Sequence, residues 1–537
     1  MILTPPLTHS GPSASSHEAY DVLVVGGGIN GVGIARDLAG RGHRVVLVEQ
    51  HDLASHTSSA STKLIHGGLR YLEHRAFSLV RKALQEREVL LRSAPHIMRP
   101  LRFVMPHDPS MRPEWLIRAG LFLYDHLARR EVLPGSCTVD LRSSELGTPL
   151  QPRFRKGFVY SDGWVDDARL VVLAAVDAAE QGAHVWTRQR CVRVQRGADH
   201  WEAHVLDERV GGLRAVRARM LVNATGPWAG RFLATTAQGL GGEKLTQHSL
   251  RLVKGSHIVV PRLFDHDHAY LFQNEDGRIM FAIPYEGHFT LIGTTDVEVQ
   301  GDPGAQAISQ EEVIYLCQQA SRYFSRELRP EDVRSSFAGV RPLLEDAAST
   351  ASEVTRDYVL ECDAQAAPLM TVWGGKMTTF RKLAEEAADQ IGHMLGDHRP
   401  AWTQHASLPG GDLSPWIGPA RRPDLDLQTF VAMLQQRFPW MPLPCLQRMA
   451  RAYGSRVFMI LGAATKMEHL GEIIAGVLTE AELQYLIDRE WAKSAQDVLW
   501  RRSKLGLHFS AAQQKAVEAW FANKNHLGMM PQVADGW

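Results

Sequence analysis

The sequence predicts an α/β protein in which a domain of the βαβ type carries an inserted, mainly antiparallel sheet and is followed by a helical domain. Three observations support this prediction. A strand–helix–strand pattern occupies residues 20–49, four short β-rich segments follow between residues 249 and 296, and only helical patterns occur from residue 427 onward. At the boundaries of these segments, the spacing of the apolar residues changes between the period of a strand and that of a helix. A chain of 537 residues is long enough for two or three domains.

Composition and charge exclude several classes of protein. The 59 Lys and Arg residues equal the 59 Asp and Glu residues, so no net field attracts nucleic acid. The five cysteines lack metal-site spacing, which predicts a reducing compartment, no disulfide framework and no metal. Residues 1–19 are predicted to be a disordered leader, because they lack the basic start and apolar core of a signal peptide. No apolar run reaches transmembrane length, so we expect a cytoplasmic chain unless something holds it at a membrane surface.

Residues 20–49 contain a glycine turn between the first strand and its helix. Gly26 permits the tight turn, Gly28 leaves room for a pyrophosphate, and Gly31 allows close packing of helix and strand. The start of the helix offers free N–H groups and the positive end of its dipole to phosphate. Glu49 ends the second strand, where an acidic side chain accepts hydrogen bonds from a ribose. Glycines alone would indicate an ordinary turn, but strand, turn, helix and acid together predict a dinucleotide site in a Rossmann-like domain.

A stretch rich in small hydroxyl residues, 56–73, follows directly after this βαβ pattern. It has two interpretations. One is a Ser/Thr-rich loop that leads into a helix around residues 84–91. The other is a loop that wraps a cofactor, because small side chains let backbone N–H groups approach a ligand. Composition alone favours neither.

Two further segments suit a backbone that passes close to a cofactor. The strand 220–222 ends in Asn-Ala-Thr-Gly at residues 223–226, and a second glycine turn at residues 373–380 feeds a helix that runs through Glu386. The N-terminus of that helix would stabilise negative charge that develops on a cofactor. A plain strand–turn and a helix N-cap are the simpler explanations of these two segments.

The antiparallel strands are predicted between these two segments, with a hairpin turn signal at residues 274–277. Residues 336–379 are then expected to return to the α/β domain, and Pro and Gly residues at 407–411 mark a linker. The predicted division is a leader at 1–19, a discontinuous cofactor domain at 20–80, 150–235 and 335–395, substrate-binding or cap regions at 81–149 and 236–334, and a helical domain at 405–537.

Several blocks of the sequence resemble the flavin-dependent glycerol-3-phosphate dehydrogenases, which are related to D-amino-acid oxidase. The blocks include GGGINGVGIARD, SSASTKLIHGGLRYLEH, VNATGPWA, KGSHIVVP, GVRPL, TRDYVL, GGKMTTFRKLAE and DVLWRRSKLG, and the resemblance covers nearly the whole chain after the leader. It implies an FAD-binding enzyme that oxidises sn-glycerol 3-phosphate to dihydroxyacetone phosphate by hydride transfer and passes electrons to a quinone. It also implies a homodimer in peripheral contact with the inner face of the cell membrane.

The resemblance assigns roles to residues within these blocks. The cofactor-binding residues would be Gly26, Gly28, Gly31, Glu49, Ser59, Ser61, Lys63, His66, Thr225, Gly226, Gly375, Lys376, Met377 and Thr378. The substrate-binding residues would be Arg70, Tyr71, Arg341, Arg356 and Lys376. Arg offers paired donors to a phosphate and Lys a point charge. His257 and Arg341 are the catalytic candidates, with His257 as general base because its ordinary pKa lies near the working pH.

Three other functions are alternatives to this enzyme. An oxygen-using glycerol-3-phosphate oxidase shares the same motifs. A non-catalytic adaptor protein of the same fold would have lost the pocket cations, which are present here. A nicotinamide enzyme is disfavoured because one βαβ fingerprint serves one dinucleotide, and the other blocks resemble flavin-binding sequences.

The segment 113–130 offers a route to a membrane surface. On a helix, its apolar residues form a broad face opposite a charged stripe; they are Trp115, Leu116, Ala119, Phe122, Leu123 and Leu127. An amphipathic helix with a basic and aromatic border is what binding to anionic lipid requires. The alternative is a core helix packed on the flavin domain, and the sequence leaves both interpretations open.

Overall fold

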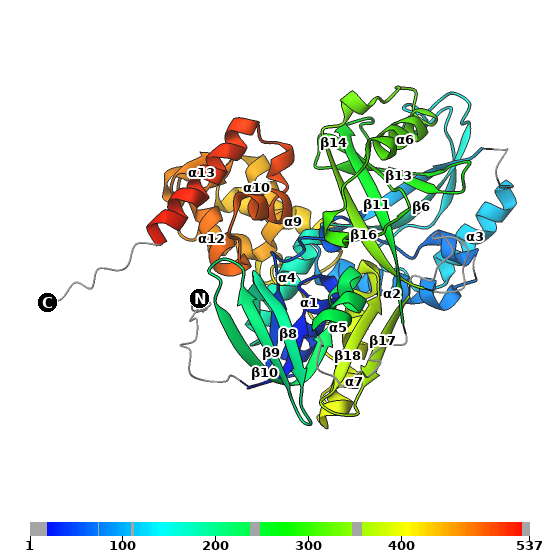
Figure 1. The fold of residues 1–537 in the computed structure, drawn as a ribbon. Helices are drawn as coiled ribbons and strands as arrows, with labels where there is room; N and C mark the ends of the chain where they lie inside the picture. Colours follow the sequence, from blue (N-terminus) through cyan, green and yellow to red (C-terminus); the bar gives the residue numbers. More distant parts are fainter. Residues whose placement is uncertain (1–18, 74, 109–111, 237–247, 346–356, 529–537) are drawn as a thin grey trace.

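Two large sheets and a helical C-terminal domain organise the chain (Figure 1). The structure is a computed structural model, and it describes residues 19–73, 75–108, 112–236, 248–345 and 357–528. The leader predicted at residues 1–19 lies outside these ranges except for Ala19, which begins the first strand.

Sheet A contains the predicted βαβ unit. Its strand order is β17-β18-β10-β1-β2-β7, and β9 and β8 extend it from β10. The strands are β1 (Ala19–Val25), β2 (Val45–Glu49), β7 (His184–Thr187), β8 (Gln189–Arg196), β9 (Trp201–Asp207), β10 (Leu213–Asn223), β17 (Tyr358–Asp363) and β18 (Leu369–Gly374). The pairs from β18 to β7 along this order are parallel. The carboxyl ends of these strands therefore meet at one edge, where ligands of open α/β sheets bind.

Helices cover one face of sheet A and build the main core. They are α1 (Ile29–Gly40), α4 (Asp167–Glu180) and α7 (Phe380–Leu395), whose apolar side chains pack on β1, β2 and β10. The other face carries α5 (Ala229–Thr236) and an apolar cluster that includes Trp201 and Trp373. β1, β2 and the end of β10 are buried on both faces, which explains their continuous apolar sequences.

Sheet B contains the predicted antiparallel strands. Its order is β15-β11-β14-β13-β12-β4-β6-β3, with β16 paired to β11 and β5 paired to β6. The strands are β3 (Leu64–Ile65), β4 (Met98–Pro106), β5 (Cys137–Asp140), β6 (Lys156–Val165), β11 (Leu250–Pro261), β12 (Ala269–Gln273), β13 (Ile279–Tyr285), β14 (Phe289–Gly293), β15 (Val297–Glu298) and β16 (Ser335–Leu344).

Three of these strands differ from the predicted division. β3, β6 and β16 lie within the ranges assigned to the cofactor domain, but all three belong to sheet B. β16 pairs along its whole length with β11, from Leu344 opposite Leu250 to Ser335 opposite Val259. The return to sheet A therefore begins at β17 and not near residue 336. Pairing with a distant strand decides sheet membership, and local patterns do not contain that information.

Helices also cover both faces of sheet B. α6 (Gln310–Ser321) packs on one face, and α2 (Phe77–Ser93) and α3 (Glu114–His126) pack on the other. Within α3, Leu121 and Tyr124 face the protein and are buried. The predicted apolar face points outward instead, with Trp115 71%, Phe122 64%, Leu116 45% and Leu123 37% exposed. This outer face of α3 is therefore not part of the core.

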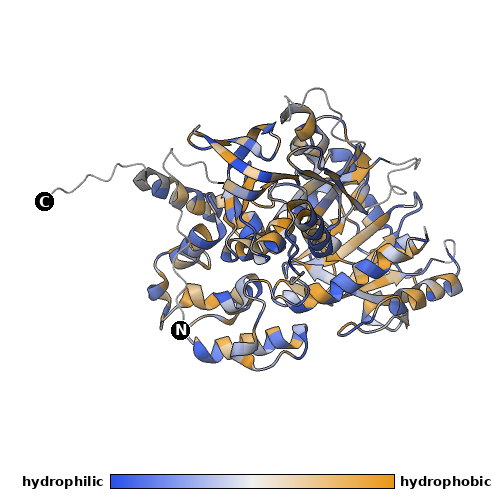
Figure 2. Cartoon of the chain, turned by 90° about the horizontal axis from the view of Figure 1, so that it is seen from below, coloured by the Kyte–Doolittle hydropathy of each residue, from blue (hydrophilic) through white to orange (hydrophobic). Residues whose placement is uncertain are grey.

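The C-terminal domain has its own apolar core. Its helices are α8 (Ser414–Ile417), α9 (Pro423–Arg437), α10 (Leu443–Tyr453), α11 (Val457–Leu461), α12 (Glu480–Glu490), the π-helix η10 (Asp497–Arg502) and α13 (Ala511–Gly528), with a small hairpin of β19 (Ile473–Ala475) and β20 (Leu478–Thr479). The helix α13, which leads towards the end marked C in Figure 2, shows both hydrophilic and hydrophobic residues. In the described ranges, no helix combines the length and the apolar character that crossing a bilayer requires.

Candidate active site

The glycine turn between β1 and α1 lies at the carboxyl edge of sheet A. Gly26 has a φ of +114°, and a Cβ there would lie 2.5 Å from the carbonyl oxygen of Ala224. A Cβ on Gly31 would lie 1.9 Å from the carbonyl oxygen of Gly26. A Cβ on Gly28 would approach only Ser58 Oγ, at 3.2 Å. Gly26 and Gly31 are thus required by the backbone itself, whereas Gly28 leaves space for a ligand.

A cavity of about 720 Å³ opens above this turn. Its wall includes six of the predicted cofactor residues, namely Gly26, Gly28, Glu49, Thr225, Gly226 and Gly375. It also includes residues that the sequence did not single out, among them Asn30, Gln189, Trp228 and Asp302. These residues come from separate loops that only the folded chain brings together. The volume is that of a typical cofactor site.

Glu49 lies in the cavity wall and is tied to the glycine turn. The N–H of Gly27 donates to its Oε2 at 2.7 Å, and the N–H of His51 donates to its Oε1 at 2.8 Å. Burial raises the pKa of Glu49, although these two backbone donors act in the opposite direction. Each carboxylate oxygen has a second lone pair, so Glu49 can still accept a bond from a sugar hydroxyl.

The cavity fits a dinucleotide. The turn offers N–H groups at the start of α1, no side chain at Gly28, and a buried carboxylate at the position of the ribose acceptor. Asn30 Nδ2 donates to the carbonyl of Gly374 at 3.2 Å, while its buried Oδ1 has no partner among the described residues. A ligand that donates a hydrogen bond would satisfy this oxygen.

The hydroxyl-rich loop after β2 is anchored by its own side chains. Ser61 Oγ donates to Asp167 Oδ2 at 2.8 Å, and Lys63 Nζ donates to Asp167 Oδ1 at 2.8 Å and to the carbonyl of Ser59 at 3.2 Å. Burial lowers the pKa of Lys63, although the charge of Asp167 acts in the opposite direction. Ser59, Ser61, Lys63 and His66 are not part of the cavity wall. Their predicted cofactor contacts stay predictions, and the contacts seen here fix the loop on α4.

His257 and Arg341 lie on one face of the β11–β16 pair. The opposed pairs His257–Phe337, Gly255–Gly339 and Val253–Arg341 place their side chains on the same side. We call the residues His257, Phe337, Gly255, Gly339 and Arg341 the β11–β16 face. Ala60 fills the space next to Gly339, since a Cβ added to Gly339 would be 2.9 Å from the Cβ of Ala60. Gly339 thus makes room for the loop, and Gly255 makes room for the guanidinium of Arg341 and for Thr294.

His257 is 1% exposed and stacks on Phe337 with ring centroids 4.9 Å apart. Its Nε2 lies 2.9 Å from Thr62 Oγ1, and its Nδ1 has no hydrogen-bond partner in the described part of the chain. Burial, followed by the charges of Arg341 and Lys63, lowers the pKa of His257 to about 3. The pKa of His257 in the folded protein thus lies far below the ordinary value on which its choice as base was argued, because sequence does not reveal burial. His257 is neutral here.

Arg341 lies next to the cavity, since Pro342 is part of the cavity wall. Its Nη2 donates to Thr294 Oγ1 at 2.9 Å, and its Nη1 pairs with Asp296. Thr294 and Asp296 both lie in the segment after β14, so two side chains of one segment fix the direction of the guanidinium. The predicted residue Arg356 lies outside the described residues.

Lys376 and Tyr71 meet beside the second glycine turn. Gly374 and Gly375 have φ angles of +73° and +98°, and Lys376 Nζ lies 3.8 Å from the centre of the Tyr71 ring. Arg70 precedes Tyr71 in the short helix Leu69–Leu72 and is partly exposed.

Met377 and Thr378 begin the turn that leads into α7. The N–H of His66 donates to Thr378 Oγ1 at 3.3 Å, which joins the hydroxyl-rich loop to this turn. Of this second turn, Gly374 and Gly375 are part of the cavity wall.

Comparison with known proteins places the chain among flavoenzymes. Residues 21–381 match the family model described as FAD dependent oxidoreductase, and residues 401–527 match that of the C-terminal domain of alpha-glycerophosphate oxidase. The chain is 52% identical over 508 residues to a glycerol-3-phosphate dehydrogenase of Pseudomonas aeruginosa, with 94% of this chain and 95% of that protein covered. It is 48% identical over 509 residues to a D-erythritol 1-phosphate dehydrogenase of Brucella abortus, with 95% and 99% covered.

A solved structure is also similar along almost the whole chain. The glycerol-3-phosphate dehydrogenase of Bacillus halodurans complexed with FAD has a TM-score of 0.75 and 26% sequence identity, with 95% of this chain and 91% of that chain covered. The similarity includes the helical C-terminal domain as well as both sheets.

Proposed function

This chain belongs to the FAD-dependent oxidoreductase family and has FAD as its cofactor, and from that premise we propose that it oxidises sn-glycerol 3-phosphate to dihydroxyacetone phosphate and delivers the electrons to a membrane quinone. The enzyme class and the cofactor expected from the sequence are confirmed. The observation that carries the proposed substrate is the β11–β16 face, where a fixed guanidinium, next in the chain to the cavity residue Pro342, shares one face with a neutral histidine.

Arg341 is the proposed phosphate ligand. Guanidinium groups bind phosphate through paired hydrogen bonds, and Thr294 and Asp296 hold this one in a fixed direction. Lys376 and Arg70 are proposed as further cations of the same pocket, with Tyr71 holding the Lys376 ammonium over its ring. Arg356 is proposed for the same role from its sequence block.

His257 is the proposed acceptor of the hydroxyl proton, through Nδ1, which has no protein partner among the described residues. Thr62 fixes the ring through Nε2. A neutral histidine is the form that a general base requires. A phosphate bound to Arg341 would offset a charge that now lowers the pKa of His257, and this would make the imidazole more basic when substrate is present.

The cofactor supplies the two-electron acceptor for the hydride of the alcohol carbon. The residues of this chain hold it. Gly26, Gly28 and Gly31 shape the turn for the pyrophosphate, Glu49 accepts from the adenosine ribose, and Asn30 offers its unpaired oxygen. The segment Gly375–Thr378 is proposed to face the flavin ring with the N–H groups at the start of α7.

The absorption spectrum of the purified protein tests the reaction. Adding glycerol 3-phosphate without oxygen should bleach the oxidised flavin band, whereas glycerol at the same concentration should bleach it far more slowly. D-Erythritol 1-phosphate belongs in the same experiment, because a relative that acts on it is 48% identical. If only that compound bleaches the band, the proposed substrate is wrong and the enzyme acts on the longer polyol phosphate.

An oxygen-using oxidase is the second candidate, because the C-terminal family model is named for alpha-glycerophosphate oxidase. Both enzymes would bleach the band, so the electron acceptor has to be measured separately. Stoichiometric hydrogen peroxide with little quinone reduction would overturn the quinone assignment.

The outer face of α3 supports the proposed contact with the membrane. This helix lies at the edge of the molecule, away from the C-terminal domain (Figure 1), and exposes Trp115, Leu116, Phe122 and Leu123. A second cavity of about 480 Å³ is lined by Arg142, Arg153, Arg155 and Lys156 and by two carboxylates, Glu114 and Asp140, which pair with Lys156 and Arg142. Apolar side chains next to a cationic hollow suit a surface rich in anionic lipid.

We propose that α3 inserts into the inner face of the cell membrane, and the variant Trp115→Glu tests this. It should keep glycerol 3-phosphate oxidation with a soluble dye but lose sedimentation with anionic vesicles. Val210→Glu is a matched control, since Val210 is 78% exposed on the distant β9–β10 turn. Equal vesicle binding by both variants and the parent would place the anchor elsewhere. The homodimer implied by the resemblance stays a prediction.

A further inference from the structure

The C-terminal domain reaches two walls of the cofactor cavity from behind. One wall is the loop after β2, where Gln50, His51 and Ala54–Ser58 face the cavity. The other is the start of β8, where Gln189, Arg190 and Cys191 face it. Asp52 and Arg188 belong to these two segments but are not part of the cavity surface. Both side chains contact the π-helix η10 of the C-terminal domain.

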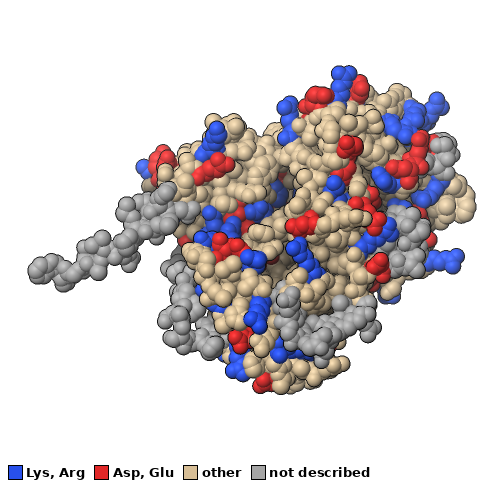
Figure 3. All heavy atoms as spheres, in the orientation of Figure 1, with Lys and Arg blue, Asp and Glu red and all other residues tan. Residues whose placement is uncertain are grey.

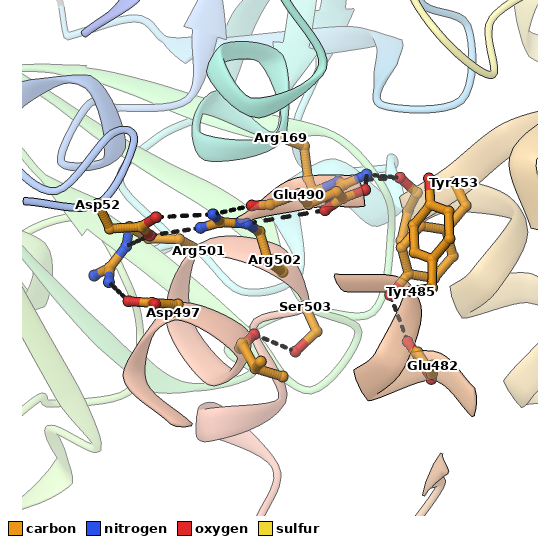
Figure 4. A network of polar contacts seen from close by, with 12 residues as sticks. Asp52, Arg169, Tyr453, Glu482, Tyr485, Glu490, Asp497, Arg501, Arg502 and Ser503 are labelled. Carbon is orange, nitrogen blue, oxygen red and sulfur yellow. Dashed lines mark hydrogen bonds and ion pairs between the residues drawn. The ribbon is translucent and has the colours of Figure 1, made fainter. Parts of the chain in front are cut away.

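Asp52 receives two guanidinium groups from η10 (Figure 4). Arg501 Nε donates to its Oδ2 at 2.6 Å, and Arg502 donates to Oδ2 at 2.6 Å and to Oδ1 at 2.8 Å. All three residues are buried. Burial alone would raise the pKa of Asp52, but the charges and hydrogen bonds of Arg502 and Arg501 outweigh it and lower the pKa to about 2. The carboxylate is therefore ionised and held at both oxygens.

The second wall is held by the first residue of the same helix. Arg188 Nη2 donates to Asp497 Oδ2 at 2.6 Å, and Asp497 also pairs with Arg501. The N–H of Arg188 donates to the carbonyl of His51 at 2.8 Å. The helix η10 thus contacts both walls, and the two walls are also bonded to each other.

A short chain of bonds connects this contact to the groups that meet the cofactor. His51 donates to Glu49, and Glu49 accepts from Gly27 of the glycine turn. Ala54 N–H donates to the carbonyl of Gly27 at 3.3 Å. Moving the loop at Asp52 would therefore move both the ribose acceptor and the turn that holds the pyrophosphate.

The geometry of η10 suits this role better than a role in stability. The N–H of Ser503 bonds to the carbonyl of Val498 at 3.0 Å, the five-residue spacing of a π-helix, and the consecutive residues Arg501 and Arg502 reach one carboxylate. Such helices recur at functional sites. Buried ion pairs add little net stability because desolvation offsets their attraction, so their main effect here is to fix positions.

We propose that η10 is a positioning element of the FAD site, so that FAD binding and docking of the C-terminal domain strengthen each other. The residues that act are Arg501 and Arg502 on Asp52, and Asp497 on Arg188. This proposal concerns the cofactor and is independent of the substrate. Coupling is reciprocal, so FAD must stabilise the docked C-terminal domain by the factor by which docking strengthens FAD binding.

The variant Arg501→Met tests the proposal, with Arg448→Met as matched control. Arg448 forms an ion pair of similar burial with Glu482, but this pair lies within the C-terminal domain and contacts neither wall. Both apoproteins are titrated with FAD, and quenching of flavin fluorescence gives the dissociation constant. We expect it to rise about 5- to 150-fold in Arg501→Met, the usual range of coupling between sites, and to stay at the parental value in Arg448→Met.

Hydrogen exchange of the amides of residues 493–507 provides the reciprocal measurement. FAD should slow exchange in the parent and in Arg448→Met, and should have little effect in Arg501→Met. If Arg501→Met does not fold, Arg188→Met supplies the same two measurements from the other wall. An unchanged dissociation constant in Arg501→Met, or in Arg188→Met where that variant replaces it, overturns the proposal. An equal rise in Arg448→Met also overturns it, because such a rise would reflect lost stability of the C-terminal domain alone.

Discussion

The cofactor cavity and the β11–β16 face lie side by side but are built in opposite ways. The cavity is made largely of backbone: its turns exist because Gly26 and Gly31 leave no room for a side chain. The β11–β16 face acts through side chains, and its glycines make room for neighbours, Gly339 for the loop at Ala60 and Gly255 for the Arg341 guanidinium. Backbone sites depend on local sequence, whereas side-chain sites depend on what surrounds them. Substitutions in the two regions should therefore fail differently.

The largest effect is expected at the glycine turn. Gly31→Val would place a side chain inside the contact with the Gly26 carbonyl, so the turn has to move and the protein should lose about 3 kcal/mol or more of stability together with its flavin. Gly28→Val has space except towards Ser58 and should give a folded apoprotein. Flavin absorbance and thermal unfolding of both apoproteins distinguish the two outcomes. A Gly28→Val protein with full flavin would show that the pyrophosphate lies elsewhere.

An intermediate effect is expected at Arg341. Arg341→Ala should lower kcat/KM for glycerol 3-phosphate, with a loss of about 2–5 kcal/mol in transition-state stabilisation. The reason is that a charge-assisted contact is lost and Asp296 is left unpaired. The loss should be much smaller for glycerol, which has no phosphate. Arg251→Ala serves as control, since Arg251 pairs with Glu298 on the same sheet and is equally exposed. Equal proportional losses on both substrates would remove the phosphate role.

The smallest stability effect, and a distinctive one, is expected at His257. Its pKa is about 3 in the folded protein and near 6.5 when exposed, so the unfolded chain binds the extra proton between these values. Stability from this group is complete above pH 6.5 and decreases as the pH falls towards 3. Between pH 7 and pH 5 the parent should lose about 2 kcal/mol more than His257→Asn, as measured by urea unfolding.

His96 sharpens this comparison because it is also buried with a pKa of about 3, but it lies near Gly410 of the C-terminal linker. His96→Asn should likewise reduce the loss of unfolding free energy between pH 7 and pH 5, and it should leave turnover at the parental value. His257→Asn should lower kcat more than it raises KM. An unchanged kcat at neutral pH would exclude His257 as the base.

The same contrast explains what the sequence could predict. The βαβ unit, Glu49 and the second glycine turn were predictable because backbone constraints appear directly as glycine spacing and strand ends. The pKa of His257 and the pairing of Lys63 with Asp167 were not, because both depend on distant chain segments. The sheet membership of β16 was missed for the same reason.

The helix α3 shows a further limit of prediction. Its periodicity revealed an apolar face but not whether protein covers it, and the structure answers that question with an exposed Trp115. Acidic and basic side chains are interspersed on the face seen in Figure 3, as the equal numbers of each in the sequence suggest.

The strand order of sheet A has a consequence for synthesis on the ribosome. β1 must wait for β10, since Ala19 pairs with Arg217, and β10 must wait for β18, since Leu221 pairs with Leu369. At normal rates of translation the nascent βαβ unit is therefore exposed for on the order of tens of seconds. During this time its apolar strands are a natural substrate for chaperones. The cofactor cavity, too, is completed only when Gly375 has emerged.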